Sequence, residues 1–163
     1  MPVIGERARP DPQRSLVGFV VGDVNYAIEI GRVREIVNPL PVTTLPHTPP
    51  EVMGVADHRG DVVPVIQLRT RFGLPEAETT RSTKWILVDA GTHTVGLVVD
   101  AVTEVFRVIG DLRPTPPVGG DRDLRGIVGV INHNEQLIFV LDVNRFVELA
   151  LALAASGLFP EGT

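Results

Sequence analysis

A stretch of twelve residues that occurs twice decides the fold of this chain. The first copy, Tyr26-Ala-Ile-Glu-Ile-Gly-Arg-Val-Arg-Glu-Ile-Val37, aligns without a gap with Val95-Gly-Leu-Val-Val-Asp-Ala-Val-Thr-Glu-Val-Phe106. Both copies end in Val, any residue, Glu and two apolar residues. Because β-branched and apolar residues dominate both copies, each copy predicts β-strand structure.

A second pair of similar segments follows the first. Met53-Gly-Val-Ala-Asp-His-Arg-Gly-Asp-Val-Val-Pro-Val-Ile-Gln-Leu68 aligns with Val128-Gly-Val-Ile-Asn-His-Asn-Glu-Gln-Leu-Ile-Phe-Val-Leu-Asp-Val143, after a loop that is six residues longer in the second copy. Two copies are too few for a solenoid, so the repeat predicts two similar small lobes packed side by side. We expect Val33 and Val102 at the seam between the lobes, with Phe19 and Trp85 inside separate lobes.

The remaining sequence predicts short strands and a stiff arm. A hairpin is expected over residues 16–30, and further strands are expected at 33–37, 52–56, 62–66, 85–89 and 94–99. Five prolines among residues 39–50 predict an extended loop held against the body. Short strands spaced by turns are typical of small β-barrels, one for each copy.

The boundaries follow from these elements. Residues 1–14 are rich in Pro and Arg and predict a flexible tail. We place subdomain 1 at about 15–83 and subdomain 2 at about 84–143. Residues 144–159, rich in Ala and Leu and opened by a capping Asn144, predict a C-terminal helix that docks on a lobe.

Composition excludes several classes of function. The 163 residues are 44% hydrophobic and contain no cysteine, which removes disulfides and cysteine-based chemistry. No stretch approaches the roughly 18 consecutive apolar residues of a membrane helix, and the first residues do not resemble a secretory signal, so we expect a cytoplasmic protein with no direct membrane insertion. A net charge of −5 and only eight aromatic residues argue against nucleic-acid binding.

The sequence offers no assembled catalytic group. All four histidines fall in predicted turns without metal-ligand spacing, and no phosphate-binding or dinucleotide-binding motif is present. Glu35 and Glu104 occupy equivalent repeat positions and could form a general acid–base pair across the seam, but a shared structural role, such as a salt bridge at a strand edge, is the more common explanation. We therefore predict a non-enzymatic protein without cofactor or metal, in which surface patches bind partners.

The order of the motifs resembles that of the CheW family of chemotaxis coupling proteins. The resemblance rests on Ile30-x-x-Val-x-Glu-Ile36, the Pro-rich arm, the 52–69 segment with Phe72-Gly73, Gly96-Leu-Val-Val-Asp-Ala-Val-x-Glu-Val105, and Leu141-Asp142, and it covers residues 16–146. It implies an all-β fold of two SH3-like subdomains of about five strands each. It also implies a non-enzymatic adaptor that joins the regulatory domain of a CheA-type histidine kinase to the cytoplasmic tips of methyl-accepting receptors, in membrane-associated arrays.

The resemblance also implies which residues contact partners. The receptor groove of the family matches Ile30, Val33 and Arg59, and repeat symmetry adds Val99 and Val102. Further partner-facing positions, for receptor or kinase, match Glu35, Ile36, Gly54 and His58.

Two positions depart from the family pattern. Where the family usually has Asn-Leu-Arg-Gly, this chain has Asp57-His58-Arg59-Gly60, and Gln67 replaces a frequent Asp. The departure at His58 leaves room for a specialised partner set. A CheW-like docking module of a larger two-component regulator is the alternative to a separate adaptor.

Overall fold

The computed structural model describes residues 15–91, 93–108, 113 and 126–145. Within these residues the strands form two sheets of five, and a short 3-10 helix and a four-residue α-helix lie between strands. The first copy of the repeat supplies β2 (Ser15–Val21), β3 (Val24–Glu29), η1 (Ile30–Arg32), β4 (Val33–Val37), β5 (Val52–His58), β6 (Asp61–Gln67) and α1 (Leu68–Arg71). The second copy supplies β7 (Lys84–Asp89), β8 (Thr94–Val99), β9 (Ala101–Arg107), β10 (Ile127–His133) and β11 (Gln136–Leu141).

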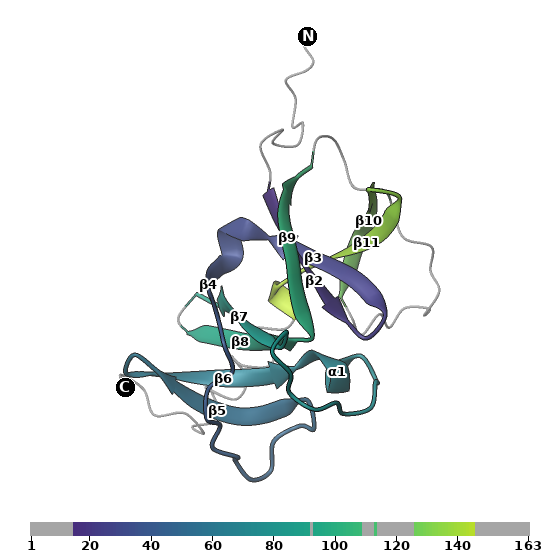
Figure 1. Cartoon of the computed structure of the whole chain (residues 1–163). Coiled ribbons are helices and arrows are strands. Elements are labelled where there is room, and N and C mark those ends of the chain that lie inside the picture. Colours follow the sequence, from purple (N-terminus) through teal and green to yellow (C-terminus); the bar gives the residue numbers. More distant parts are fainter. Residues whose placement is uncertain (1–14, 92, 109–112, 114–125, 146–163) are drawn as a thin grey trace.

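The strands form two sheets with the same internal order. Sheet I runs β9-β2-β3-β11-β10, and sheet II runs β4-β7-β8-β6-β5. Neighbours are antiparallel except for β3 with β11 and β8 with β6, which are parallel and occupy equivalent places in the two sheets. Figure 1 shows sheet I in the upper part of the molecule and sheet II in the lower part. The prediction of an all-β fold with two five-stranded units is confirmed.

The two copies of the repeat exchange strands. The hairpin β2–β3 belongs to the first copy but joins the last three strands of the second copy in sheet I, and the hairpin β7–β8 joins β4, β5 and β6 in sheet II. The division near residue 83 is therefore wrong as a boundary between the two units, because neither sheet is a contiguous half of the chain. The chain turns from one sheet to the other directly after each hairpin, through Ile30–Arg32 and through Asp100.

Side chains of both sheets form one shared core. Its members from sheet I include Phe19, Tyr26 and Ile28, and those from sheet II include Ile86 and Leu97. Val33 and Val102 pack against this core, as predicted for seam residues. Phe19 was expected inside one lobe and instead lies in the shared core, because the exchanged hairpin presents one face to the opposite sheet.

Smaller clusters fill each sheet on its other side. Trp85 packs within sheet II with Ala56, Val63, Val65, Leu87 and Val98, in agreement with the prediction that it lies inside one lobe. Leu16, Ala27, Phe106, Val108, Ile131, Ile138 and Val140 form the corresponding cluster of sheet I. Each of these side chains is less than 10% exposed.

Charged hydrogen bonds cross-link the two copies where the chain changes sheet. Asp100, between β8 and β9, accepts hydrogen bonds from Arg69 Nε at 3.0 Å and Nη2 at 3.0 Å, and from the backbone N–H of Gly22 at 2.7 Å. At the other crossing, Arg32 donates to Asn144 Oδ1 at 2.9 Å and to the carbonyl oxygen of Asp89 at 2.7 Å. The crossings are therefore held by residues distant in sequence.

Two predicted elements lie outside the described residues. These are the tail at 1–14 and the C-terminal helix at 144–159, of which only Asn144 and Arg145 are described; both are helical. None of the helices in the described part of the chain is long and apolar enough to span a membrane.

Candidate protein-binding site

The structure assembles a polar cluster at the open edge of sheet II. Glu35 lies on β4 and His58 on β5, the two outermost strands of the sheet. His58 Nε2 lies 3.2 Å from Glu35 Oε1, and Arg59 Nη2 donates to Glu35 Oε2 at 3.0 Å. Because these contacts join the two free edges of one sheet, the cluster acts as a clasp that draws the sheet toward a closed barrel.

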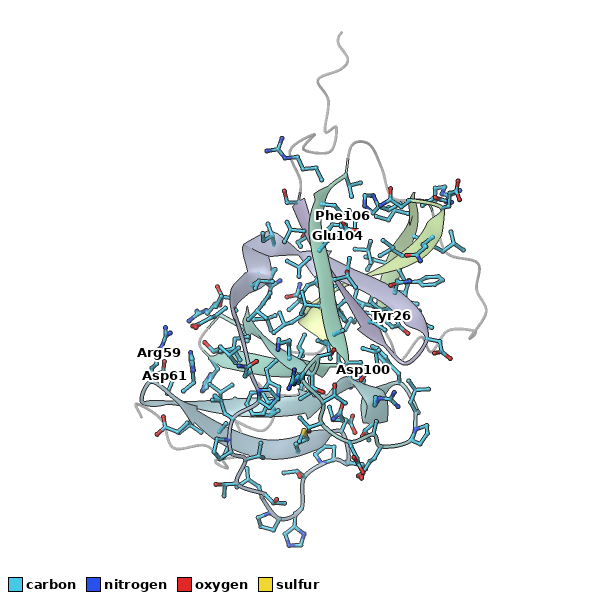
Figure 2. All side chains as sticks on the ribbon, viewed as in Figure 1. Tyr26, Arg59, Asp61, Asp100, Glu104 and Phe106 are labelled. Atoms are coloured by element: carbon cyan, nitrogen blue, oxygen red, sulfur yellow. The ribbon has the colours of Figure 1, made fainter. Side chains whose placement is uncertain are left out.

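Arg59 is the exposed member of this clasp. Its side chain is 73% exposed, whereas that of His58 is 17% exposed. Figure 2 shows Arg59 at the tip of the β5–β6 hairpin, near Asp61. A long cation held in one orientation by a neighbouring carboxylate is well suited to donate several hydrogen bonds to a partner.

The backbone conformation of Arg59 is unusual for this residue type. Arg59 and Gly60 form the turn between β5 and β6 with φ angles of 54° and 87°. Turns of this kind favour Asn, Asp and Gly, which tolerate the left-handed region. At the equivalent turn between β10 and β11, Asn134 and Glu135 have φ angles of 54° and 65°, with Asn134 in the place of Arg59. The first copy therefore carries an arginine where the second carries a residue suited to the turn.

The other residues expected in the receptor groove differ in exposure. Ile30, on η1, is 42% exposed, and Val33 and Val102 are partly buried against the shared core. Val99 is 1% exposed and lies in that core. Such burial does not agree with the expectation that Val99 contacts a partner. That expectation came from the repeat, which makes Val99 the equivalent of Ile30, but Ile30 is exposed and Val99 is not.

The remaining expected contact residues divide between surface and structure. Ile36 on β4 is 38% exposed, and its repeat equivalent Val105 on β9 is 55% exposed. Gly54 is buried and has φ 146°, and a Cβ atom there would overlap the carbonyl oxygen of Thr43 in the Pro-rich arm. The arm is bonded to β5 at this point, through Thr43 N to Val55 O at 2.8 Å and Val55 N to Thr43 O at 2.9 Å. Gly54 therefore holds the arm in place and offers no side chain to a partner.

A second His–Glu pair lies at the open edge of sheet I. His133 Nε2 on β10 is 3.4 Å from Glu104 Oε2 on β9, and the His133 ring stacks on Phe106 with ring centroids 4.3 Å apart. The two glutamates predicted as equivalent are each paired with a histidine of their own sheet. Glu35 also forms an ion pair with Arg59 at the edge of sheet II, which fits the structural explanation. The two glutamates lie in different sheets, and each contacts its own histidine.

The repeat alignment contained the signal for this second pair, since His58 aligns with His133 and Glu35 with Glu104. The histidines were predicted only as separate turn residues, and neither pair was predicted. Within the described ranges no group of three or more His, Asp or Glu side chains is placed to hold a metal ion.

Comparison with known proteins agrees with this architecture. A family model described as "CheW-like domain" matches residues 15–150. A chemotaxis protein CheW of Helicobacter pylori is 34% identical over 133 residues, covering 81% of this chain and 80% of the relative. The protein FrzA of Myxococcus xanthus is 31% identical over 146 residues, covering 88% and 91% respectively.

A solved structure shares the fold. The crystal structure of the scaffolding protein TtCheW from Thermoanaerobacter tengcongensis aligns with a TM-score of 0.72 and 28% identity, over 81% of this chain and 90% of that one. The fold and the site thus define an all-β scaffold domain of two SH3-like subdomains. The chain belongs to the CheW-like family.

Proposed function

We propose that this protein couples methyl-accepting receptors to the regulatory domain of a CheA-type histidine kinase, as a cytoplasmic adaptor recruited to receptor arrays. Membership of a family of chemotaxis scaffolds supports this general role. In this proposal the receptor-binding surface consists of the clasp residues Glu35, His58 and Arg59 together with the exposed Ile30 and Ile36. Val33 and Val102, also expected in the receptor groove, are partly buried against the shared core.

The conformation of Arg59 carries the proposal. A non-glycine residue in the left-handed region costs about 1 kcal/mol or more, and such residues cluster at functional sites. The cost of about 1 to 2 kcal/mol is offset only in part by the ion pair with Glu35, because an exposed pair typically contributes about 0.2 to 1 kcal/mol. Folding alone therefore favours Asn at this turn, as at Asn134, and binding is the reason we infer for an arginine.

The substitution Arg59→Asn tests the proposal because it should leave stability unchanged or higher while it weakens receptor binding. We expect its melting temperature to equal or exceed that of the wild type, since Asn suits the turn. Binding to a purified cytoplasmic receptor fragment should weaken by about 30-fold, the equivalent of about 2 kcal/mol for loss of an interface anchor. Isothermal titration calorimetry measures the binding, and Arg81→Asn, on an exposed loop, is the matched control.

The possible results separate the components of the proposal. Unchanged receptor binding by folded Arg59→Asn refutes the assigned surface. A coupling protein must bind both the receptor fragment and the kinase regulatory domain. If the wild-type protein does not bind one of them, the coupling function itself is refuted.

A further inference from the structure

We propose that sheet I carries a docking pocket for an acidic segment of a protein partner. The pocket has a volume of about 370 Å³ and is open to solvent between the end of β9 and β10, which are the two edge strands of sheet I. Its lining residues are Phe106, Arg107, Val108, Arg113, Val130, Ile131, Asn132 and His133. Figure 2 shows Phe106 and Glu104 on β9, far from Arg59, so the pocket is separate from the clasp of sheet II.

Two arginines make this pocket positive. Arg107 and Arg113 are both exposed, and within the described part of the chain neither guanidinium group has a hydrogen bond or ion pair. Several other arginines are paired: Arg69 binds Asp100, Arg34 binds Asp89 and Arg71 binds Glu51. In a chain of net charge −5, two unpaired guanidinium groups at one pocket form a local site for an anion.

The repeat indicates that folding does not require these arginines. Arg113 bridges to Val130 through two backbone hydrogen bonds of 3.1 and 2.9 Å, and Thr43 bridges to Val55 in the same way in the first copy. Arg107 follows Phe106 as Asn38 follows Val37 in the aligned segment. The same backbone arrangement thus forms with neutral residues, and only the second copy places positive charge on it.

The rest of the pocket suits a glutamate or aspartate side chain. Phe106, Val108 and Ile131 are mostly buried and supply an apolar floor for methylene groups, and the exposed Asn132 can donate from its amide. His133 Nε2 is buried and forms no hydrogen bond within the described residues. Glu104, whose side chain is 50% exposed, has a carboxylate oxygen 3.4 Å from this nitrogen. Because Glu104 already places negative charge beside the pocket, both arginines are needed for the binding of a partner's carboxylate to be favourable.

The open shape of the pocket favours a protein partner over a free small molecule. Sites for small ligands usually enclose most of the ligand surface. This pocket instead lies on one face of the sheet edge, where a partner can insert one acidic side chain while its backbone rests on the rim. Binding of this kind relies on bidentate Arg–carboxylate contacts and is sensitive to salt.

The test uses the full chain and a defined acidic probe, so that its outcome does not depend on the proposed coupling function. Acetyl-tetraglutamate amide is titrated into the ¹⁵N-labelled protein and followed by heteronuclear NMR. We expect saturable shifts confined to the amides of residues 106–108 and 130–133. The double substitution Arg107→Gln/Arg113→Gln should weaken binding by about tenfold or more. The control Arg81→Gln/Arg145→Gln removes the same charge elsewhere and should change binding by less than about twofold.

Several results would overturn the proposal. These are the absence of saturable shifts at millimolar peptide, shifts spread over the whole surface, and equal losses in the two double variants. Free glutamate binding as tightly as the peptide would assign a small-anion site instead of a docking site. If the Gln variant does not fold, the variant Arg107→Lys/Arg113→Lys replaces it, because lysine keeps the positive charge but lacks the planar guanidinium group. Unchanged peptide affinity in this Lys variant also refutes the proposal.

Discussion

The substitution Asp100→Ala tests whether the crossing between the sheets is fixed by charged hydrogen bonds. Asp100 joins β8 of sheet II to β9 of sheet I. Its carboxylate accepts from Arg69 Nε and Nη2 and from the Gly22 N–H, which lies 78 residues away in sequence. These hydrogen bonds and the nearby negative charge raise the pKa of Arg69 above its usual value, against the opposing effect of burial. The guanidinium therefore stays charged at every pH of interest.

The magnitude follows from exposure and geometry. The side chains of Arg69 and Asp100 are 20% and 30% exposed, so solvent screens the pair only in part. Removing the carboxylate also leaves the Gly22 N–H and a partly buried guanidinium without their acceptor. Bidentate pairs of this kind contribute about 2 to 3 kcal/mol, so Asp100→Ala should lower the melting temperature by about 5 to 10 °C.

Asp89 provides a matched control within the same protein. Its carboxylate also accepts from one glycine N–H, that of Gly91 at 2.7 Å, and from one arginine, Arg34 at 3.0 Å. These contacts are local or exposed, with side chains 48% and 44% exposed for Arg34 and Asp89. Urea unfolding followed by circular dichroism should give a midpoint shift for Asp89→Ala of less than about a third of that for Asp100→Ala. Equal shifts, or no shift for Asp100→Ala, would refute the reasoning.

The remaining predictions concern the arm, one titration and the exchanged strands. Gly54→Ala should destabilise the protein by about 2 kcal/mol or more in urea unfolding, because its Cβ meets the Thr43 carbonyl, whereas Gly31→Ala, with no atom near the added Cβ, should cost less than about 1 kcal/mol. The pKa of the Asp89 carboxyl should lie below 3.8 in a ¹³C NMR titration, because the Gly91 N–H and, to a smaller extent, Arg34 stabilise the charged carboxylate. Its contribution to stability is therefore present above about pH 4 and is lost as the pH falls through the folded pKa. The substitution Arg34→Gln should reverse only part of this pKa shift. A fragment that ends before β7 should show no cooperative thermal unfolding as a monomer, because it contains neither complete sheet.

Much of the fold was predictable because its signals are local. Alternating and β-branched runs indicated most of the strands, and the repeat indicated two equivalent units. The assignment of strands to sheets was not predictable in this way. Whether β4 continues beside β3 or crosses to the other sheet depends on packing against β7, which lies about 50 residues later, and the sequence of Ile30–Arg32 does not encode that choice by itself.

The candidate site was predictable in part, from the family resemblance and the repeat. The contact role of Arg59 was predicted from the family resemblance, and the exposure of its side chain agrees with that role. Its partner Glu35 was identified as a separate position, because their contact spans 24 residues and two strands that are not neighbours in the sheet. Val99 was misplaced because the alignment equates it with Ile30, although η1 lifts Ile30 onto the surface while Val99 ends a buried strand.

The exchange of strands also has a consequence for the ancestry of such a chain. One copy of the repeat has as many strands as one sheet, but two of its strands lie in one sheet and three in the other. A polypeptide with a single copy would therefore complete both sheets only in a homodimer of identical chains. Fusing two copies makes that association intramolecular and independent of concentration. It also frees each half to change alone, so that one hairpin tip can keep Arg59 while its counterpart keeps Asn134, and a symmetric ancestor can give rise to an adaptor with two unlike faces.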